Sequence, residues 1–303
     1  MRRASTCCLL VTLAPWAGAS ALAQTAATAT GDGDAQAASQ CLERAFAAFA
    51  AKDQAALDAL LCGVFTGGAG PGADIIAEWS ARWPPPGPDA KAAKITVCGD
   101  MAYAVLEVPP PLGRKAPYDA LDRCSLVTVL VRSGEAWRVG GMSSILAASA
   151  PAALPPETRE LWFRGHGFLR YDIYNMVREL GTFGWDVIAD SRFAAVPDPK
   201  GAGLEVLTTQ ALVDRIYADM DKRKLRKADI PPMTLPRTRE EFSIVGLSSA
   251  FFTTKVLAHG EGDTTTPVQW AMLLDWQPDQ PIWVGRLLVL APLPDEANVK
   301  PTQ

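Results

Sequence analysis

Two similar hairpin patterns decide the fold that the sequence predicts. The stretch LVTVLVRSGEAWRVGGM runs from Leu126 to Met142, and the looser copy QWAMLLDWQPDQPIWVGRLLVL runs from Gln269 to Leu290. In each stretch, branched and aromatic residues stand on both sides of a short turn segment, which is typical of two antiparallel strands in a buried sheet. The sequence therefore predicts one such hairpin in each half of the chain.

The spacing of the predicted strands repeats as well. Strands are expected to begin near residues 94, 124 and 135 in the first half and near 242, 268 and 282 in the second, which gives offsets of 148, 144 and 147 residues. Helical segments precede the strands in both halves, so each sheet is expected to bury one face against helices. We therefore expect the α+β class with two similar units in tandem. The alternative is that any two buried hairpins with a tryptophan look alike.

Changes of composition divide the chain into six predicted segments. They are a signal peptide (1–23), a flexible leader (24–38), a first domain (39–147), an Ala/Pro linker (148–158), a second α+β domain that is a divergent copy of the first (159–293), and a tail (294–303).

The first residues have the pattern of an export signal. Arg2 and Arg3 precede the apolar run CCLLVTLA, and the small residues Ala21-Leu22-Ala23 follow before Gln24. This run is too short to span a membrane, and no later segment is longer and equally apolar. We therefore expect cleavage near Ala23, a periplasmic or secreted location, and no membrane span in the mature chain.

Four cysteines remain after the predicted cleavage: Cys41, Cys62, Cys98 and Cys124. An even number in an oxidising compartment predicts two disulfides. An antiparallel helix pair favours the bond from Cys41 to Cys62, whereas a bond from Cys98 to Cys124 depends on a strand register that the sequence leaves open. The spacing does not match paired zinc ligands, so no metal is expected.

Charge and missing motifs exclude several functions. Removal of residues 1–23 takes away two arginines and no acids, so 27 basic and 33 acidic residues leave a net charge of −6. No concentrated basic face is predicted, which argues against nucleic acid as a partner. Phosphate-loop, dinucleotide and zinc-protease motifs are absent, so no cofactor is expected. His166 lies in RGHGF, before a predicted helix, and is expected to be structural or exposed.

Residues 39–146 resemble the nuclear transport factor 2-like superfamily, which includes SnoaL-like and ketosteroid isomerase-like proteins. The resemblance rests on the turn Lys52-Asp53 between two helices, on Gly99-Asp100 before an alanine-bearing strand, and on Trp137 in the last hairpin. It implies a cone-like unit, in which a strongly curved sheet is wrapped on three helices with a pocket between them, so the two units are expected to be cones in tandem. Residues 160–292 resemble the family less, because they lack the lysine-aspartate turn and begin with a longer helix.

Five residues are candidates for binding a ligand. Trp79 and Trp83 are four residues apart on the predicted third helix and share one face, which the resemblance places at the mouth of the cavity. Tyr103 and Arg123 are candidate polar groups of the first cone, and Tyr171 is a candidate hydrogen-bond donor in the second. An apolar cavity with a few polar groups is typical of a small-molecule site.

These features favour an exported binding protein without catalytic residues, whose cone or sheet surface holds a small apolar ligand or an envelope protein. Pairing of sheets is expected either in a homodimer or between the two units of one chain. One alternative is an isomerase, hydratase or cyclase that uses a pocket carboxylate, for which Asp100, Glu107 and Asp275 are candidates. The other is an immunity or inhibitor protein of the cell envelope.

Overall fold

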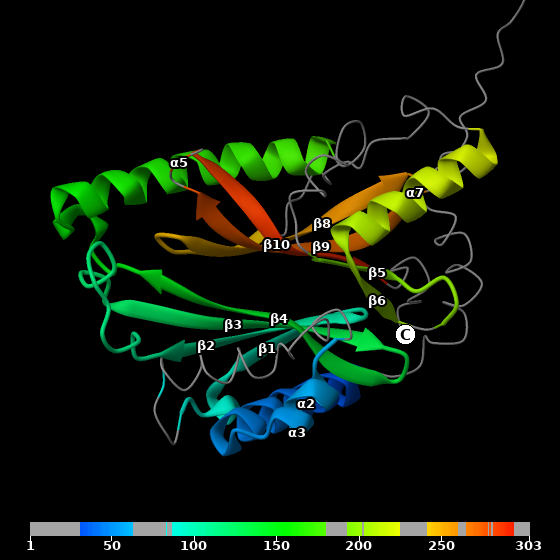
Figure 1. The fold of residues 1–303 in the computed structure, drawn as a ribbon, viewed down its shortest axis with the longest axis horizontal. Helices are drawn as coiled ribbons and strands as arrows, with labels where there is room; N and C mark the ends of the chain where they lie inside the picture. The colour runs from blue at the N-terminus through cyan, green and yellow to red at the C-terminus, as the bar shows by residue number, and fades with distance from the viewer. Residues whose placement is uncertain are drawn as a thin grey trace, which may run out of the picture.

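The computed structural model describes residues 31–62, 83, 87–179, 193–201, 203–224, 241–259, 265–277, 279 and 281–293. These residues form helices and two β-sheets, which confirms the expected α+β class (Figure 1). The predicted signal peptide and the predicted third helix, apart from Trp83, lie outside the described residues.

Two helices open the described chain, α2 (Gly31–Ala51) and α3 (Gln54–Leu60). The expected turn between them is confirmed: Lys52 adopts a left-handed conformation, and the Asp53 carboxylate accepts a hydrogen bond from the Ala56 N–H at 3.0 Å. An acidic residue is favoured there because it satisfies a backbone donor that the first helical turn leaves free.

Helix α2 begins earlier than the sequence predicts. Residues 31–38, expected to belong to a flexible leader, are helical. Two contacts explain the difference: Ala38 is fully buried, and the Asp34 carboxylate pairs with the Arg132 guanidinium at 3.0 Å. Small residues that read as a leader in the sequence therefore pack as the first turns of a helix.

The first sheet follows a short 3-10 helix, η2 (Ala90–Ala92). Its strands are antiparallel and lie in the order β1-β2-β3-β4. They are β1 (Lys94–Cys98), β2 (Met101–Val108), β3 (Arg123–Ser133) and β4 (Ala136–Ala147).

The second sheet has six strands in the order β6-β5-β10-β9-β8-β7, and β5 and β10 are its parallel pair. Its last four strands, β7 to β10, follow one another in the same spatial order as β1 to β4. The elements of this half are η3 (Pro151–Ala153), α5 (Pro156–Glu179), β5 (Phe193–Pro197), β6 (Leu204–Thr208), α7 (Thr209–Arg223), β7 (Glu241–Val245), β8 (Ser249–His259), β9 (Thr265–Gln277) and β10 (Ile282–Pro292).

Two features of this half were not expected. The hairpin β5–β6 was missed, and helix α5 begins at Pro156, inside the predicted linker, so that His166 lies within the helix and not before it. Proline is well tolerated in the first turn of a helix, because the N–H that it lacks would have no partner there. Helix α7 is N-capped, since the Thr208 hydroxyl accepts a hydrogen bond from Ala211 N–H at 3.2 Å.

The two sheets lie face to face in the middle of the molecule (Figure 1). Helices α2 and α3 cover the outer face of the first sheet, and α5 and α7 cover the outer face of the second. The buried layer between the sheets is called the inter-sheet core below. Its residues are Met101, Tyr103, Val127, Val129, Val131 and Ile145 from the first half and Ala195, Leu204, Phe251, Ala271, Leu273, Leu287, Val289 and Ala291 from the second, together with Cys62.

Strand β3 shows why the quoted stretch LVTVLV has no polar alternation. Leu126 and Leu130 pack in the core beneath the helices, whereas Val127 and Val129 pack in the inter-sheet core. Alternate side chains of a strand point to opposite faces, so a strand that is covered on both sides must be largely apolar. The run LVTVLV, with Thr128 as its one polar residue, therefore marks a strand that is buried on both faces.

Two hydrogen bonds to backbone carbonyls of β4 connect the second sheet to the first. Leu247 N–H donates to the Leu146 carbonyl at 2.9 Å, and the Ser249 hydroxyl donates to the Ser144 carbonyl at 3.1 Å. At Gly246, a Cβ atom would overlap the Leu146 carbonyl oxygen and lie 2.8 Å from Ile145 Cγ2. Glycine is therefore required where the turn between β7 and β8 meets β4.

We expect Gly246→Ala to destabilise the fold. The added methyl group forces the turn away from β4 and strains the hydrogen bond to Leu146, at a cost of about 1–3 kcal/mol in the free energy of unfolding. Gly167→Ala is the matched control, because Gly167 lies in helix α5 with open space around it. Urea unfolding of both variants would show this difference, and equal stability of the two would contradict the proposed backbone contact.

Candidate functional site

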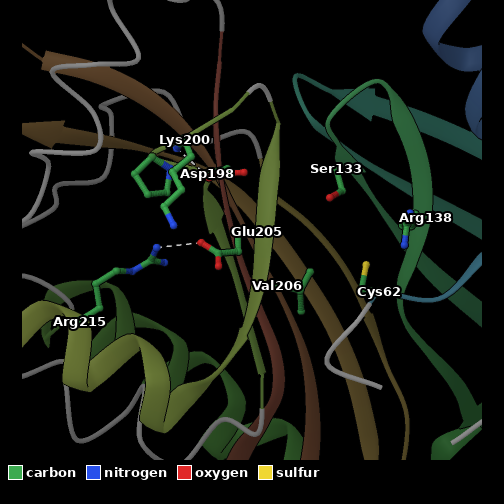
Figure 2. Close-up of a pocket in the computed structure, with 9 residues that line it drawn as sticks. Cys62, Ser133, Arg138, Asp198, Lys200, Glu205, Val206 and Arg215 are labelled. Carbon is green, nitrogen blue, oxygen red and sulfur yellow. Dashed lines mark hydrogen bonds and ion pairs between the residues drawn. The ribbon is translucent and has the colours of Figure 1, made fainter. Parts of the chain in front are cut away.

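A cavity of about 440 Å³ opens where the two halves of the chain meet (Figure 2). Its lining is mostly polar and charged. The residues are Cys62, Ser133, Arg138, Asp198, Pro199, Lys200, Glu205, Val206 and Arg215.

The first half supplies one wall of the cavity. Cys62 follows helix α3, and its N–H donates to the Val139 carbonyl at 3.1 Å, which fixes the thiol beside strand β4. Ser133 ends β3, and Arg138 lies on β4. Ser133 also pairs with Gly203 in an isolated β-bridge, so the hairpin β3–β4 touches the hairpin β5–β6 at the rim of the cavity.

The second half supplies the opposite wall, beginning with the turn between β5 and β6. Asp198 N–H donates to the Gly203 carbonyl at 3.1 Å, and the Asp198 carboxylate accepts from Lys200 N–H at 2.8 Å. These bonds hold the turn in shape and use one oxygen of the carboxylate. In Figure 2, Lys200 and Asp198 lie across the cavity from Ser133 and Arg138.

An ion pair completes this second wall. Glu205 on β6 and Arg215 on α7 approach to 2.8 Å, because the helix follows directly after the strand and folds back over it. The two side chains are 40% and 31% exposed, so solvent screens their attraction and the pair adds little stability. Its effect on the site is to neutralise both charges.

The two cysteine thiols near the cavity are kept protonated by burial. Burial raises the pKa of Cys62 to about 12, the charge of Arg138 lowers it, and the neighbouring Cys41 raises it further. Burial likewise raises the pKa of Cys41 to about 11, and its thiol donates to the Trp137 carbonyl at 3.2 Å. Thiols with such pKa values are poor nucleophiles at neutral pH.

The two predicted disulfides are not present, since no two of the four cysteines are bonded to each other in the structure. Strand order excludes the bond from Cys98 to Cys124. Strand β2 lies between β1 and β3, and Cys98 pairs with Met101 at one end of β2 while Cys124 pairs with Val108 at the other. Cys41 and Cys62 do lie near each other, but the Cys41 thiol is engaged by a backbone carbonyl.

The three predicted ligand-binding residues that the structure describes do not lie together. Trp83 is buried beneath the helices, with its Nε1 donating to the Pro109 carbonyl at 3.5 Å. Tyr103 lies in the inter-sheet core, 5.3 Å from the ring of Phe242, and Arg123 is exposed at the start of β3. Trp79 and the side chain of Tyr171 lie outside the described part of the chain.

The three candidate carboxylates for an isomerase reaction are also spread apart, and each has a partner. Asp100 accepts from Arg132 Nε at 2.7 Å, Asp275 pairs with Arg286 at 3.4 Å, and Glu107 accepts from Ser125 Oγ at 2.7 Å. None of them lines the cavity.

His166 has a structural position. Its Nδ1 lies 2.8 Å from the Trp162 carbonyl, one turn earlier in α5, and its ring stacks on that of Trp162 at 4.2 Å. Burial lowers its pKa, because the charged form loses contact with water. The flanking Gly165 accepts a hydrogen bond from Trp283 Nε1 at 2.8 Å, so this glycine serves the contact between helix and sheet.

The cavity residues from 198 to 206 were missed because the hairpin β5–β6 that carries them was missed. The sequence FAAVPDPKGAGLEVLT holds two short β-forming runs around a turn rich in Pro, Gly and Asp, which is a hairpin signal. That signal would have placed Asp198 and Lys200 in the turn. Asp198 and Lys200 line the same cavity as Arg138 only because the two sheets pack together, and the local sequence does not encode that packing.

Comparison with known proteins identifies no relative: no family model, curated protein or solved structure matches this chain. Among the described residues, no three His, Cys, Asp or Glu side chains gather in a way that would hold a metal ion. In the same part of the chain, no helix is both long and apolar enough to cross a membrane.

The thiols of Cys41 and Cys62 are expected to react slowly with iodoacetamide in the folded protein. A rise of the pKa from 9.0 to about 11 lowers the thiolate fraction about 100-fold at pH 8, and steric burial slows the reaction further. Peptide mass spectrometry after labelling, with the urea-unfolded protein as control, measures the ratio. Labelling as fast as in urea, or a bond between the two sulfurs, would contradict the buried thiols.

The pKa of His166 predicts a loss of stability in acid. Its folded pKa lies below the value of 6.5 for a free histidine, so the unfolded chain takes up the proton first as pH falls through 6.5. The stabilising contribution of the neutral ring is complete above that pH and is lost below it. The free energy of unfolding should fall more from pH 7 to pH 5 in the native sequence than in His166→Gln, and parallel curves would exclude this residue as the cause.

Proposed function

We propose that this chain is an exported binding protein, without catalytic activity of its own, that holds a small ligand in the cavity between its two halves. The halves are two cone-like units in tandem, related to the nuclear transport factor 2-like superfamily. Support for the repeat comes from the strand order, because β1 to β4 and β7 to β10 form the same antiparallel meander with helices on the outer face.

The observation that carries the proposal is the shared lining of the cavity. Cys62, Ser133 and Arg138 come from the first half, and the turn at 198–200 with Glu205 comes from the second. A volume of about 440 Å³ is within the range of small-molecule sites. Polar groups converge on it from several elements, as expected for a site that orients a ligand.

The chemistry of the lining favours binding over catalysis. General acid–base catalysis needs a proton acceptor that is free and within reach of the substrate. Here Glu205 is neutralised by Arg215, one oxygen of Asp198 holds the turn, and the Cys62 thiol stays protonated because of burial. An isomerase mechanism would also require one of the candidate carboxylates in the cavity, and Asp100, Glu107 and Asp275 lie elsewhere.

The proposal predicts a ligand that is lost on unfolding. The protein would be purified gently and its mass recorded first in native and then in denaturing solution. We expect an excess native mass that disappears on denaturation. Ser133→Trp should abolish this excess, because the indole fills the cavity, whereas Glu135→Trp, two residues away in the same turn and outside the lining, should keep it.

Two outcomes would contradict the proposal: a native protein without excess mass after gentle purification, or an excess mass that Ser133→Trp retains. The denatured mass also tests export independently. A chain that begins at Gln24 supports removal of residues 1–23, and a chain that keeps Arg2 and Arg3 opposes it.

A further inference from the structure

In the part of the chain that the structure describes, the arginines on strands are paired with carboxylates, with one exception. Four arginines lie on these strands, and three of them form an ion pair. The pairs are Arg123 with Glu107 at 3.5 Å, Arg132 with Asp34 at 3.0 Å, and Arg286 with Asp275 at 3.4 Å.

Arg138 is the exception. It forms no hydrogen bond or ion pair with the described residues, although its side chain is half-buried at the wall of the cavity. The positive charge of Arg138 lowers the pKa values of Cys62 and Cys41, but burial raises both by more. Those thiols are neutral at physiological pH, so they do not balance the guanidinium.

An unpaired, half-buried guanidinium is costly, because it loses part of its hydration without gaining a counter-charge. Each of the other three strand arginines has a carboxylate within ion-pair distance, and Arg138 differs from them in this respect. Arg138 instead lines a space that is large enough for a small molecule (Figure 2). A bound carboxylate or phosphate would accept two parallel hydrogen bonds from the Arg138 guanidinium and balance its charge.

The opposite wall carries a second cation without a carboxylate partner. Lys200 lies in the turn between β5 and β6. Its backbone N–H donates to Asp198, and its ammonium group forms no ion pair with the described residues. Arg215 is neutralised by Glu205. Three cations and two carboxylates line the cavity, so its net charge is +1 in a chain whose formal net charge is −4.

From this arrangement we infer that the cavity binds a small organic anion, whose carboxylate or phosphate group is held by Arg138 and approached from the other wall by Lys200. The inference rests on the proposed function, because it names the ligand class for the same cavity. Val206 and Pro199 offer apolar contact to the body of such a ligand, and the Ser133 hydroxyl offers a further hydrogen bond. The ligand is therefore an acid with a short carbon skeleton, and not the apolar molecule that the sequence alone favours.

The test measures binding of three probes by isothermal titration calorimetry at constant ionic strength: glutarate, inorganic phosphate, and the neutral glutaramide. The full exported chain is used after any resident ligand has been removed by dialysis. We expect at least one anion to bind and glutaramide not to bind. Glutarate and phosphate distinguish a carboxylate ligand from a phosphate ligand.

Variants assign the binding to the named residue. Arg138→Gln is expected to weaken anion binding about tenfold or more, since a hydrogen bond to a charged group is lost. Arg138→Lys should restore part of it, because the charge returns without the planar fork. Arg123→Gln is the matched control, a strand arginine of the same sheet outside the cavity, and should bind as the native chain does. The melting temperature without probe checks that each variant folds.

Three results would overturn the inference. They are equal anion binding by Arg138→Gln, equal weakening by the control Arg123→Gln, and binding of glutaramide as strongly as glutarate. Failure of the inference is distinguishable from failure of the proposed function. A neutral molecule found in the native mass record, with no binding of either anion, would keep the cavity as a ligand site and reject the anion.

Discussion

The burial of one face of each sheet against the other is the constraint on which the rest of this structure depends. It requires β3 to be apolar on both sides, as Val127 and Leu126 show by facing different cores. It leaves the outer faces to the helices, and it excludes any side chain at Gly246, where the halves meet backbone to backbone. It also buries Tyr103 in the inter-sheet core, so the inner face of the first sheet is covered by the second sheet of the same chain.

The same constraint determines where a ligand can be held. Large apolar side chains fill the middle of the inter-sheet layer, and polar groups can converge only at its rim. The rim cavity forms where the hairpin β5–β6 extends the second sheet, and the described residues of the first half contain no matching hairpin. The site therefore depends on the hairpin β5–β6, which the second half has in addition to its meander. The core, in contrast, is formed mainly by the two four-stranded meanders.

The sequence predicted what depends on local pattern and failed where distant segments meet. The turn at Lys52-Asp53 was recognised, and six strands of the two meanders begin near their predicted positions, but β2 and β8 were not separated from the strands that precede them. The bond from Cys98 to Cys124 was wrong because alternation along a strand does not reveal which strand lies between two others. Arg138 could not be singled out, since a strand arginine becomes unusual only when its neighbours across space are known. Two of the aromatic residues predicted to bind a ligand, Trp83 and Tyr103, pack in the cores.

The electrostatics of the cavity differ from those of the protein around it. The net negative charge of the chain repels an approaching anion, but that repulsion acts over long distances and is screened beyond about 8 Å at physiological salt. The attraction of a half-buried guanidinium acts at contact, in a region of lower dielectric constant, and is screened much less. Salt at physiological concentration therefore removes more of the repulsion than of the attraction. A single unpaired arginine in a sheltered cavity can in this way retain an anion in an acidic protein, which a cluster of exposed lysines on the same surface would do only weakly.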